Sequence, residues 1–400
     1  MQLNTDDFTF LVGDFDVLMH MPETPVLPMF SETAVGFLAA LSRKILTDRR
    51  TREYVDVTSY AYWIRKASLE TVKENHRDYG SRLGRGVAFH VAPSNVPVNF
   101  AVSMTSSLLA GNCTVIRVSN KEFVQVEIIC DAINALLAEE YVCMKPYLCL
   151  LRYEHSERIT QELSALCDLR IIWGGNRTIE TIRRAALPPR AIEMTFADRH
   201  SLAIINAEAY LESDAAEVAK GFYTDTYYTD QNACSSPRLV VWTGKEVEKA
   251  KRKFWDALDT LVRDEYEMKP IQAVDKYSSF CLLAMEQTGV KKVSQNNYVV
   301  RIEVDALTKE LMNYKNGGGY FFEYTAKELE EIVPVLSKQC QTISVLGESK
   351  ERIKQLVFTH GVRGVDRIVP LGQTMGLEFI WDGFKMIEAM TRFVYTGEYV

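Results

Sequence analysis

The sequence lacks the features that mark several large classes of protein. Its eight cysteines include no Cys-x-x-Cys pair and most lie in apolar runs, which argues against disulfides and against a zinc site. The acidic start of the chain does not match the basic start and apolar core of a signal peptide, and no apolar stretch is long enough to span a bilayer. The sequence therefore predicts a cytoplasmic protein with no metal site and no membrane span.

Charge and composition narrow the class further. The formal net charge is −7 and the basic residues are scattered, so nucleic acid is not an expected partner. With 47% hydrophobic and 25% charged residues and no low-complexity tract, the chain has the composition of a soluble globular enzyme. Its 400 residues exceed the size at which one core usually stops growing, which predicts two domains.

Apolar periodicity predicts a helical lead-in over residues 1–80, with a helical period from Glu32 to Leu46, followed by alternating strands and helices. Strands are predicted at Val87–Val91, Cys113–Val118, Leu148–Tyr153 and Ile171–Trp173, and helices at residues 98–110 and Glu122–Glu139. This alternation favours a parallel sheet with crossover helices. After Pro188-Pro189 the pattern restarts with a strand at Ser201–Ile205 and continues to about residue 360. We therefore expect domains at residues 1–200 and 201–364, with the segment of about 365–400 packing back or serving oligomerisation.

The most informative residue is Cys234, which lies among the small and hydrogen-bonding residues of Asp230–Arg238, just before the apolar run Leu239–Trp242. This context is typical of a nucleophile on a loop that enters a strand. A thiolate attacks carbonyl carbons and also leaves readily, which suits covalent acyl chemistry. A small buried hydrophobic cysteine is the alternative interpretation.

A second loop, Pro93-Ser94-Asn95-Val96-Pro97, follows the first predicted strand. Its two prolines stiffen the backbone, so the Asn95 amide would point in a fixed direction. An amide N–H is a neutral donor that suits a developing oxyanion. The alternative is a simple Asx or proline turn.

The loop after the next strand offers Arg117, Ser119 and Asn120, with Lys121 beyond them. A basic and hydroxylic strand end can hold a ribose or a phosphate, because ligands bind beyond the carboxyl ends of strands in open α/β sheets. An ordinary solvated strand exit is the alternative.

The last of these loops contains Gly174, Gly175 and Asn176 and leads into a helix predicted at Ile179–Arg184. Paired glycines before a helix allow a pyrophosphate to approach exposed backbone N–H groups. The segment is not a Gly-x-Gly-x-x-Gly fingerprint, so its spacing alone is a weak signal.

Taken together, these motifs resemble the aldehyde dehydrogenase superfamily and, within it, the long-chain acyl-CoA reductase family of bacterial luminescence systems. The resemblance covers roughly residues 80–400. It is carried by five segments: Gly86–Pro97, Leu109–Asn112, Gln231–Pro237, Gly364–Gln373 and Trp381-Asp382-Gly383.

The resemblance implies a fold of two Rossmann-like, doubly wound α/β domains, the first binding NAD(P) and the second carrying the nucleophile Cys234. Asn95 would match the superfamily's oxyanion asparagine, and Arg117 its adenosine-ribose lysine. Gly174 and Gly175 would match the loop under the cofactor's pyrophosphate.

One departure from the superfamily carries chemical information. Most aldehyde-oxidising relatives have a glutamate that activates water to hydrolyse the thioester, and the corresponding stretch, Phe196–Leu202, contains none. An enzyme that keeps its acyl thioester dry until hydride arrives has no use for such a base. The departure favours reduction over oxidation, although Glu193 lies only three residues away and a register slip would restore a carboxylate. His200 reads as a structural histidine more readily than as a base.

The resemblance thus implies NADPH-dependent reduction of a fatty acyl thioester, either acyl-CoA or acyl-protein, to an aldehyde through an acyl-enzyme at Cys234. NADPH is preferred over the alternative, NADH, because Asn120 stands where NAD-selective members often have a glutamate that repels a 2′-phosphate. An acyl-protein synthetase partner and a homo-oligomer are also expected. The alternatives are an aldehyde-oxidising or acylphosphate-reducing relative, and an acyl-transfer or scaffold subunit without reductase activity.

Overall fold

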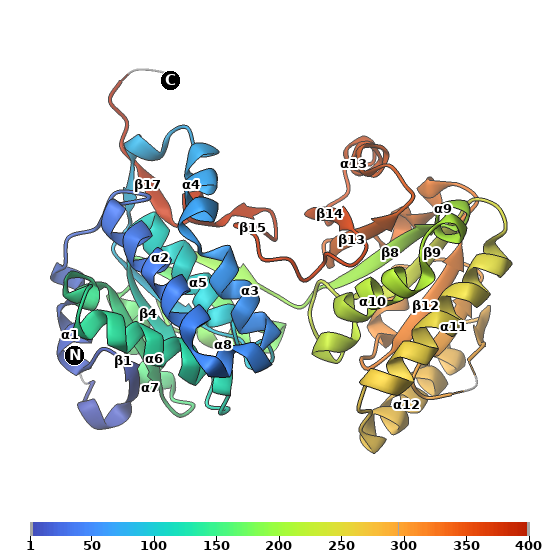
Figure 1. Cartoon of the computed structure of the whole chain (residues 1–400), viewed down its shortest axis with the longest axis horizontal. Helices are drawn as coiled ribbons and strands as arrows, with labels where there is room; N and C mark the ends of the chain where they lie inside the picture. Colours follow the sequence, from blue (N-terminus) through green and yellow to red (C-terminus); the bar gives the residue numbers. More distant parts are fainter. Residues whose placement is uncertain (1–2, 295, 398–400) are drawn as a thin grey trace. The chain divides into compact units, whose positions relative to one another are not determined.

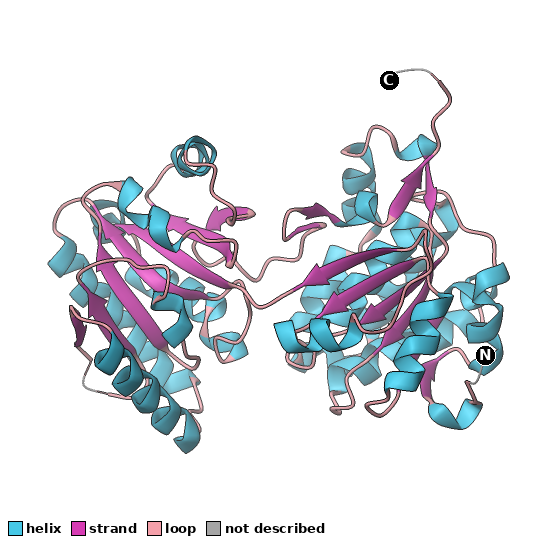
Figure 2. Ribbon diagram, turned by 180° about the vertical axis from the view of Figure 1, so that it is seen from behind, coloured by secondary structure: helices cyan, strands magenta, loops and turns pink. Residues whose placement is uncertain are grey.

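The structure of the chain is a computed structural model that describes residues 3–294 and 296–397 (Figure 1). It divides into two compact units, one made of Met1–Ala197 and Leu377–Val400 and the other of Asp198–Gly376. Each unit has its own sheet with helices on both faces (Figure 2), which confirms the predicted fold class. No helix in the described part of the chain is both long and apolar enough to cross a membrane.

The first unit is built on a six-stranded sheet in the order β1-β5-β4-β3-β6-β7. All neighbouring strands are parallel except β1 and β5. The strands are β1 (Thr9–Val12), β3 (Val87–Val91), β4 (Cys113–Arg117), β5 (Leu148–Arg152), β6 (Leu169–Trp173) and β7 (Ile192–Phe196).

Helices cover both faces of this sheet because its buried strands present apolar side chains in both directions. One core joins the sheet to α2 (Glu32–Thr47), α3 (Val55–Trp63), α4 (Lys66–Glu74), α5 (Asn99–Ala110), α6 (Val124–Ala138) and α14 (Met386–Ala389). The core on the other face joins it to α1 (Phe15–His20), α7 (Glu157–Leu166) and α8 (Asn176–Ile182). Successive residues of β3 alternate between these cores, with Ala88 in one and Val87 and Phe89 in the other.

The turn between α5 and β4 shows how local sequence directs the chain into the strand that precedes a predicted ligand loop. Gly111 follows the helix with φ +91°, and a Cβ at this position would lie 2.0 Å from the Leu27 carbonyl oxygen. Only glycine fits there. Asn112 then accepts a hydrogen bond from the Arg85 N–H at 2.7 Å and donates one to the Met390 carbonyl at 3.0 Å. The predicted helix stop is confirmed.

The C-terminal residues are divided between the two units. Strand β14 (Arg367–Pro370) belongs to the second sheet, whereas β17 (Thr391–Phe393) pairs with β2 (Arg82–Gly84) of the first unit. A short hairpin of β15 (Ile380–Trp381) and β16 (Phe384–Lys385) precedes β17. The functional roles predicted for the two domains, and a role of the C-terminal segment in oligomerisation, stay predictions.

The second unit has a seven-stranded sheet in the order β10-β11-β12-β9-β8-β13-β14, parallel except for the edge pair β10 and β11. Its remaining strands are β8 (His200–Asn206), β9 (Pro237–Thr243), β10 (Val290–Lys292), β11 (Val300–Val304), β12 (Tyr320–Thr325) and β13 (Cys340–Leu346). One face packs on α9 (Ala207–Glu212), α10 (Ala215–Asp225) and α11 (Val247–Glu265), and the other on α12 (Pro270–Glu286) and α13 (Lys350–Thr359).

The strands and helices predicted with strong periodicity are confirmed to within a few residues. Two strands of the first unit's six-stranded sheet were missed. Strand β1 is only four residues long and pairs at the edge of the sheet, inside a segment that otherwise reads as helical. Strand β7 follows Pro188-Pro189, which we took as a break, and its sequence alternates polar with apolar residues.

A buried carboxylate organises the centre of the second unit. Glu323 on β12 is fully buried, and its Oε1 accepts hydrogen bonds from the indole N–H groups of Trp242 and Trp255 at 2.8 and 2.7 Å. Its Oε2 accepts from Arg301 Nη2 at 2.7 Å and Nε at 3.1 Å. The charge is therefore paired and both oxygens are hydrogen-bonded, which is the condition under which a buried ion is tolerated.

Removing this carboxylate should destabilise the second unit strongly. We expect Glu323→Ala to lower the free energy of unfolding by about 3–5 kcal/mol, because Arg301 and two indole N–H groups lose their acceptor. Urea unfolding followed by tryptophan fluorescence measures the change. As a control, Lys354→Ala removes one partner of an exposed ion pair with Glu351 and should change stability by no more than about 0.5 kcal/mol. Equal effects of the two substitutions would contradict the prediction.

Candidate active site

The predicted ligand loops of the first unit lie at one edge of its sheet. They follow β3, β4 and β6, which are neighbouring parallel strands in the order β4-β3-β6. The helices after β3 and β4 pack on one face, and those after β5 and β6 pack on the other. The chain therefore changes its winding direction between β3 and β6, and such a switch point is where open α/β sheets bind ligands.

Asn95 is exposed in the loop after β3, and its side chain forms no hydrogen bond among the described residues. The start of the loop is fixed to the neighbouring strand by a hydrogen bond from the Ala92 N–H to the Arg117 carbonyl at 3.0 Å. The role of Asn95 as a donor to a ligand stays a prediction.

Strand β4 ends in Arg117, and the loop after it begins beside this cation. The Arg117 guanidinium lies over the Tyr153 ring, 4.7 Å from its centroid, and the buried Nε has no hydrogen-bond partner among the described residues. Ser119 Oγ accepts from the Lys121 N–H at 3.2 Å. The Asn120 amide donates at 3.4 Å both to the Tyr153 carbonyl and to a carboxylate oxygen of Glu154, an acidic neighbour absent from our sequence argument.

The loop after β6 is shaped by aromatic packing. The Trp173 ring stacks on Phe196 at 3.7 Å between centroids, and its indole N–H donates to Ser103 Oγ at 3.0 Å. The Gly174 N–H donates to the Phe196 carbonyl at 3.2 Å. Helix α8 begins at Asn176, three residues before the predicted start, and has only seven residues.

These loops present to a ligand polar groups that have no partner in the described part of the chain. The Arg117 Nε and the Asn95 amide are left without partners at the edge where Gly174 and Gly175 carry no side chain. Unsatisfied donors beside backbone that a ligand can approach closely are what a dinucleotide requires.

Cys234 lies in the second unit, on a loop with unusual backbone geometry. Asp230 and Gln231 both adopt left-handed conformations, with φ of 52° and 57°. Left-handed backbone at residues with a Cβ costs roughly 1–3 kcal/mol each and persists only where surrounding contacts impose it. Cys234 itself is partly exposed, and its carbonyl accepts a hydrogen bond from Ser201 Oγ at 2.7 Å.

The contacts that impose this geometry come from Gln231, which is fully buried. Its Nε2 donates to the Pro237 and Tyr320 carbonyls at 2.8 and 3.1 Å. Its Oε1 accepts from the Gly319 and Tyr320 N–H groups, both at 3.0 Å. The Gln231 carbonyl in turn accepts from Arg238. All the hydrogen-bonding capacity of the side chain is used to fasten the loop to the starts of β9 and β12.

Electrostatic attraction couples two cations, Arg238 and Lys315, to Cys234. Burial lowers the pKa of Arg238 to about 10, and the Cys234 charge acts in the opposite direction. Burial also lowers the pKa of Lys315, repulsion by Arg238 adds to this, and Asp198 and Cys234 raise it. Our sequence analysis missed Lys315, because nothing in its local sequence links it to a residue 81 positions earlier.

The two side chains that the sequence left open as water-activating bases are Glu193 and His200. Glu193 on β7 accepts from Arg170 Nε at 2.8 Å and from Arg183 Nε at 2.6 Å, so both of its oxygens are engaged. His200 is buried, and burial, with repulsion by Lys315, lowers its pKa to about 4. A neutral imidazole with so low a pKa is a poor general base near neutrality.

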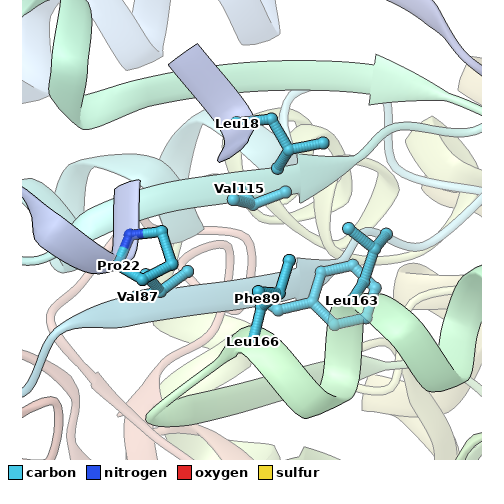
Figure 3. Close-up of a pocket in the computed structure, with 7 residues that line it drawn as sticks. All are labelled: Leu18, Pro22, Val87, Phe89, Val115, Leu163 and Leu166. Atoms are coloured by element: carbon cyan, nitrogen blue, oxygen red, sulfur yellow. The ribbon is translucent and has the colours of Figure 1, made fainter. Parts of the chain in front are cut away.

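Other features of the structure lie away from these residues. A cavity of about 10 Å³ in the first unit is lined by apolar side chains such as Leu18, Phe89 and Leu163 (Figure 3), and it has room for one water at most. A cavity of about 160 Å³ in the second unit is lined by residues that include Trp255, Asp259 and Arg301. Neither contains a predicted site residue. Among the described residues no group of three or more His, Cys, Asp or Glu side chains could hold a metal ion.

Comparison with known sequences identifies a family. The model of the family described as acyl-CoA reductase (LuxC) matches residues 24–393. A long-chain acyl-protein thioester reductase of Vibrio harveyi is 24% identical over 334 residues, which cover 79% of this chain and 65% of that protein. The protein of the same name from Aliivibrio fischeri is 22% identical over 318 residues, which cover 78% and 64%. The matched region thus spans less than two thirds of the length of these relatives.

Solved structures show the same fold at low sequence identity. Aldehyde dehydrogenase 21 from Physcomitrella patens aligns with a TM-score of 0.66 and 11% identity, covering 94% of this chain and 88% of that one. Lactaldehyde dehydrogenase from Escherichia coli aligns with a TM-score of 0.63 and 14% identity, with the same coverage. The fold predicted from the motifs, that of an aldehyde dehydrogenase, is confirmed.

The burial of the thiols predicts which of them react in the native protein. Burial raises the pKa of Cys113, Cys130, Cys167 and Cys340 to about 12 and also raises that of Cys149. These five should therefore remain protonated and unreactive at pH 8, because the thiolate is the nucleophile. Iodoacetamide should label only Cys143, Cys234 and Cys281, which are exposed or partly exposed. Peptide mapping by mass spectrometry before and after denaturation checks this, and native labelling of a buried thiol at the Cys234 rate would refute it.

Proposed function

The chain belongs to the acyl-CoA reductase (LuxC) family, and we propose that it reduces a fatty acyl thioester to an aldehyde through an acyl-enzyme at Cys234. The observation that carries the proposal is the partly exposed thiol of Cys234, on a loop that has left-handed backbone, is fastened by the Gln231 side chain and lies near cations. Strain of this kind is typical of functional sites.

In the first step the Cys234 thiolate attacks the carbonyl carbon of the acyl donor, and a new C–S bond forms. The carbonyl oxygen becomes an oxyanion, for which the Asn95 amide and a backbone N–H near Cys234 are the proposed donors. When the oxyanion collapses, the bond to the donor sulfur breaks, the donor thiolate leaves, and the acyl group remains on Cys234.

The fate of this acyl thioester depends on whether water can be activated beside it. Both oxygens of Glu193 are occupied by arginines, and the imidazole of His200 is a weak base. The thioester would therefore persist long enough to be reduced, which supports reduction over the aldehyde-oxidising alternative.

The cofactor we propose is a nicotinamide dinucleotide, which would supply a hydride to the acyl carbon. The bond from that carbon to the Cys234 sulfur then breaks, which releases the aldehyde and returns the thiolate. Arg117, Ser119 and Asn120 would hold its ribose and phosphate, and Gly174, Gly175 and Asn176 would line its pyrophosphate. We propose NADPH as the preferred form because Arg117 and Lys121 flank the neutral Asn120. The carboxylate of Glu154 beside Asn120 would repel a 2′-phosphate and so opposes this preference.

The acyl donor is either acyl-CoA or an acylated protein. The curated relatives are named acyl-protein thioester reductases, which favours a protein-bound donor delivered by a synthetase partner. A homo-oligomer remains part of this proposal.

Replacing the nucleophile should abolish acylation. Incubation of Cys234→Ala with a fluorescent acyl-CoA is expected to give no covalent label, whereas wild type is labelled without cofactor, because the thiolate is the only proposed acceptor. Asn95→Ala should still be labelled, but about 10²–10³-fold more slowly, as expected for one lost oxyanion donor. Ser94→Ala, a change in the same exposed loop, serves as the control. Persistent labelling of Cys234→Ala, traced to another cysteine, would show that the nucleophile is misassigned.

The preference for NADPH or NADH tests whether the loop after β4 recognises the 2′-position of the cofactor. The value of kcat/KM should be at least as high for NADPH as for NADH, because a cation beside a phosphate forms a hydrogen bond worth roughly 1.5–3 kcal/mol. Asn120→Glu should move the preference toward NADH, and Glu154→Gln should move it toward NADPH. A wild-type enzyme that clearly prefers NADH, or variants that leave the ratio unchanged, would place recognition of the 2′-position elsewhere.

A further inference from the structure

Lys315 follows a short 3-10 helix (Leu311–Tyr314) and begins the loop that leads into β12. This loop packs directly on the loop that carries Cys234. The Gly318 N–H donates to the Asp230 carbonyl at 2.9 Å, and the Asn316 carbonyl accepts from Arg238. At Gly317 a Cβ would lie 2.7 Å from the Asp230 carbonyl oxygen, so the two backbones approach as closely as glycine permits.

Further hydrogen bonds fix both loops in this arrangement. Gln231 in the Cys234 loop binds the N–H groups of Gly319 and Tyr320 through its Oε1. The buried ammonium of Lys276, on α12, donates to the Gly318 carbonyl at 2.6 Å. The positions of Lys315 and Cys234 are therefore set by one rigid network rather than by two independent loops.

The Lys315 side chain differs from those of the deeply buried lysines in this unit. Lys251 pairs with Glu303 at 3.2 Å, and Lys276 is bound to backbone carbonyls. Lys315 is half-buried, yet its ammonium forms no hydrogen bond or ion pair among the described residues. Partial burial of an unpaired cation is unfavourable unless it interacts with charge nearby.

Four titratable groups interact with this ammonium: Cys234, Arg238, Asp198 and His200. The first two lie on the Cys234 loop and at the start of β9, and the last two lie at the start of β8 and just before it. Arg238 donates to the carbonyls of Gln231 and Asn316, so it joins the two loops and also adds positive charge beside Cys234. His200 is neutral near pH 7 because its pKa is about 4.

We propose that the Lys315 ammonium stabilises the thiolate form of Cys234 and so keeps the nucleophile reactive at neutral pH. The inference rests on the proposed function only in that Cys234 is taken as the nucleophile. A cation beside a thiol favours its ionised form, as in other reactive cysteines. Asp198 opposes this effect in part, since its carboxylate also attracts the ammonium.

Alkylation of Cys234 tests the role of Lys315 without acyl donor or cofactor. The rate of modification by iodoacetamide is measured between pH 5 and 10 by peptide mass spectrometry. In Lys315→Met the pH of half-maximal rate should rise by about one unit. The rate at pH 7 should fall by about three- to fourfold rather than tenfold, because a more basic thiolate is intrinsically more nucleophilic. Lys315→Arg, which keeps the charge, should return both quantities close to wild type.

Matched variants separate charge from structure. Lys309→Met removes the same charge from an exposed site six residues away and should leave the pH profile unchanged. Lys315→Gln gives a second neutral variant in case the methionine lowers the melting temperature. An unshifted profile in a folded, neutral Lys315 variant overturns the inference, as does a shift of equal size in Lys309→Met. If the profile shifts but Cys234 is never acylated, the reductase proposal fails while the role of Lys315 stands.

Discussion

The hydrogen bonds of the Gln231 side chain are the constraint on which the second unit's candidate site depends. Two consecutive left-handed residues would relax to extended backbone if nothing held them. Gln231 prevents this by joining the Cys234 loop to the first residues of β9 and β12, with both its donors and both its acceptor positions occupied. Strands β9 and β12 are themselves paired in the centre of the sheet, so the loop inherits their rigidity.

Because the loop is rigid, the charged side chains near Cys234 keep fixed positions. Arg238 and Lys315 are coupled to Cys234 by electrostatic attraction. In the first unit two arginines occupy the carboxylate of Glu193, and in the second unit burial lowers the pKa of His200. Under the proposed function, a cysteine kept as a thiolate and not accompanied by a water-activating base would form an acyl thioester and preserve it. The proposed reduction needs both properties, because the acyl thioester must first form and must then survive until the hydride arrives.

In the first unit the candidate ligand loops are positioned in a different way. Its ligand loops are positioned by strand order, because the carboxyl ends of β4, β3 and β6 adjoin at a switch point of the sheet. Specific contacts then adjust them: Arg117 against Tyr153, and Trp173 against Phe196. The Glu154 carboxylate reaches Asn120 from the end of the neighbouring strand β5, so charge at this site is contributed by more than one loop.

The sequence alone determined the elements and motifs whose signals are local. The strands around the ligand loops, the helix stop at Gly111 and the loops bearing Asn95, Arg117, Gly174 and Cys234 were predicted because periodicity, turn chemistry and motif spacing extend over a few residues. Tertiary structure decided what depends on distant partners. Gln231 accepts a hydrogen bond from the Tyr320 N–H, 89 residues away, and Glu193 accepts one from Arg170, 23 residues before it. Such contacts decide whether a side chain can act as a base, whether it fastens a loop, or whether it places a charge beside a thiol. No local sequence pattern encodes them.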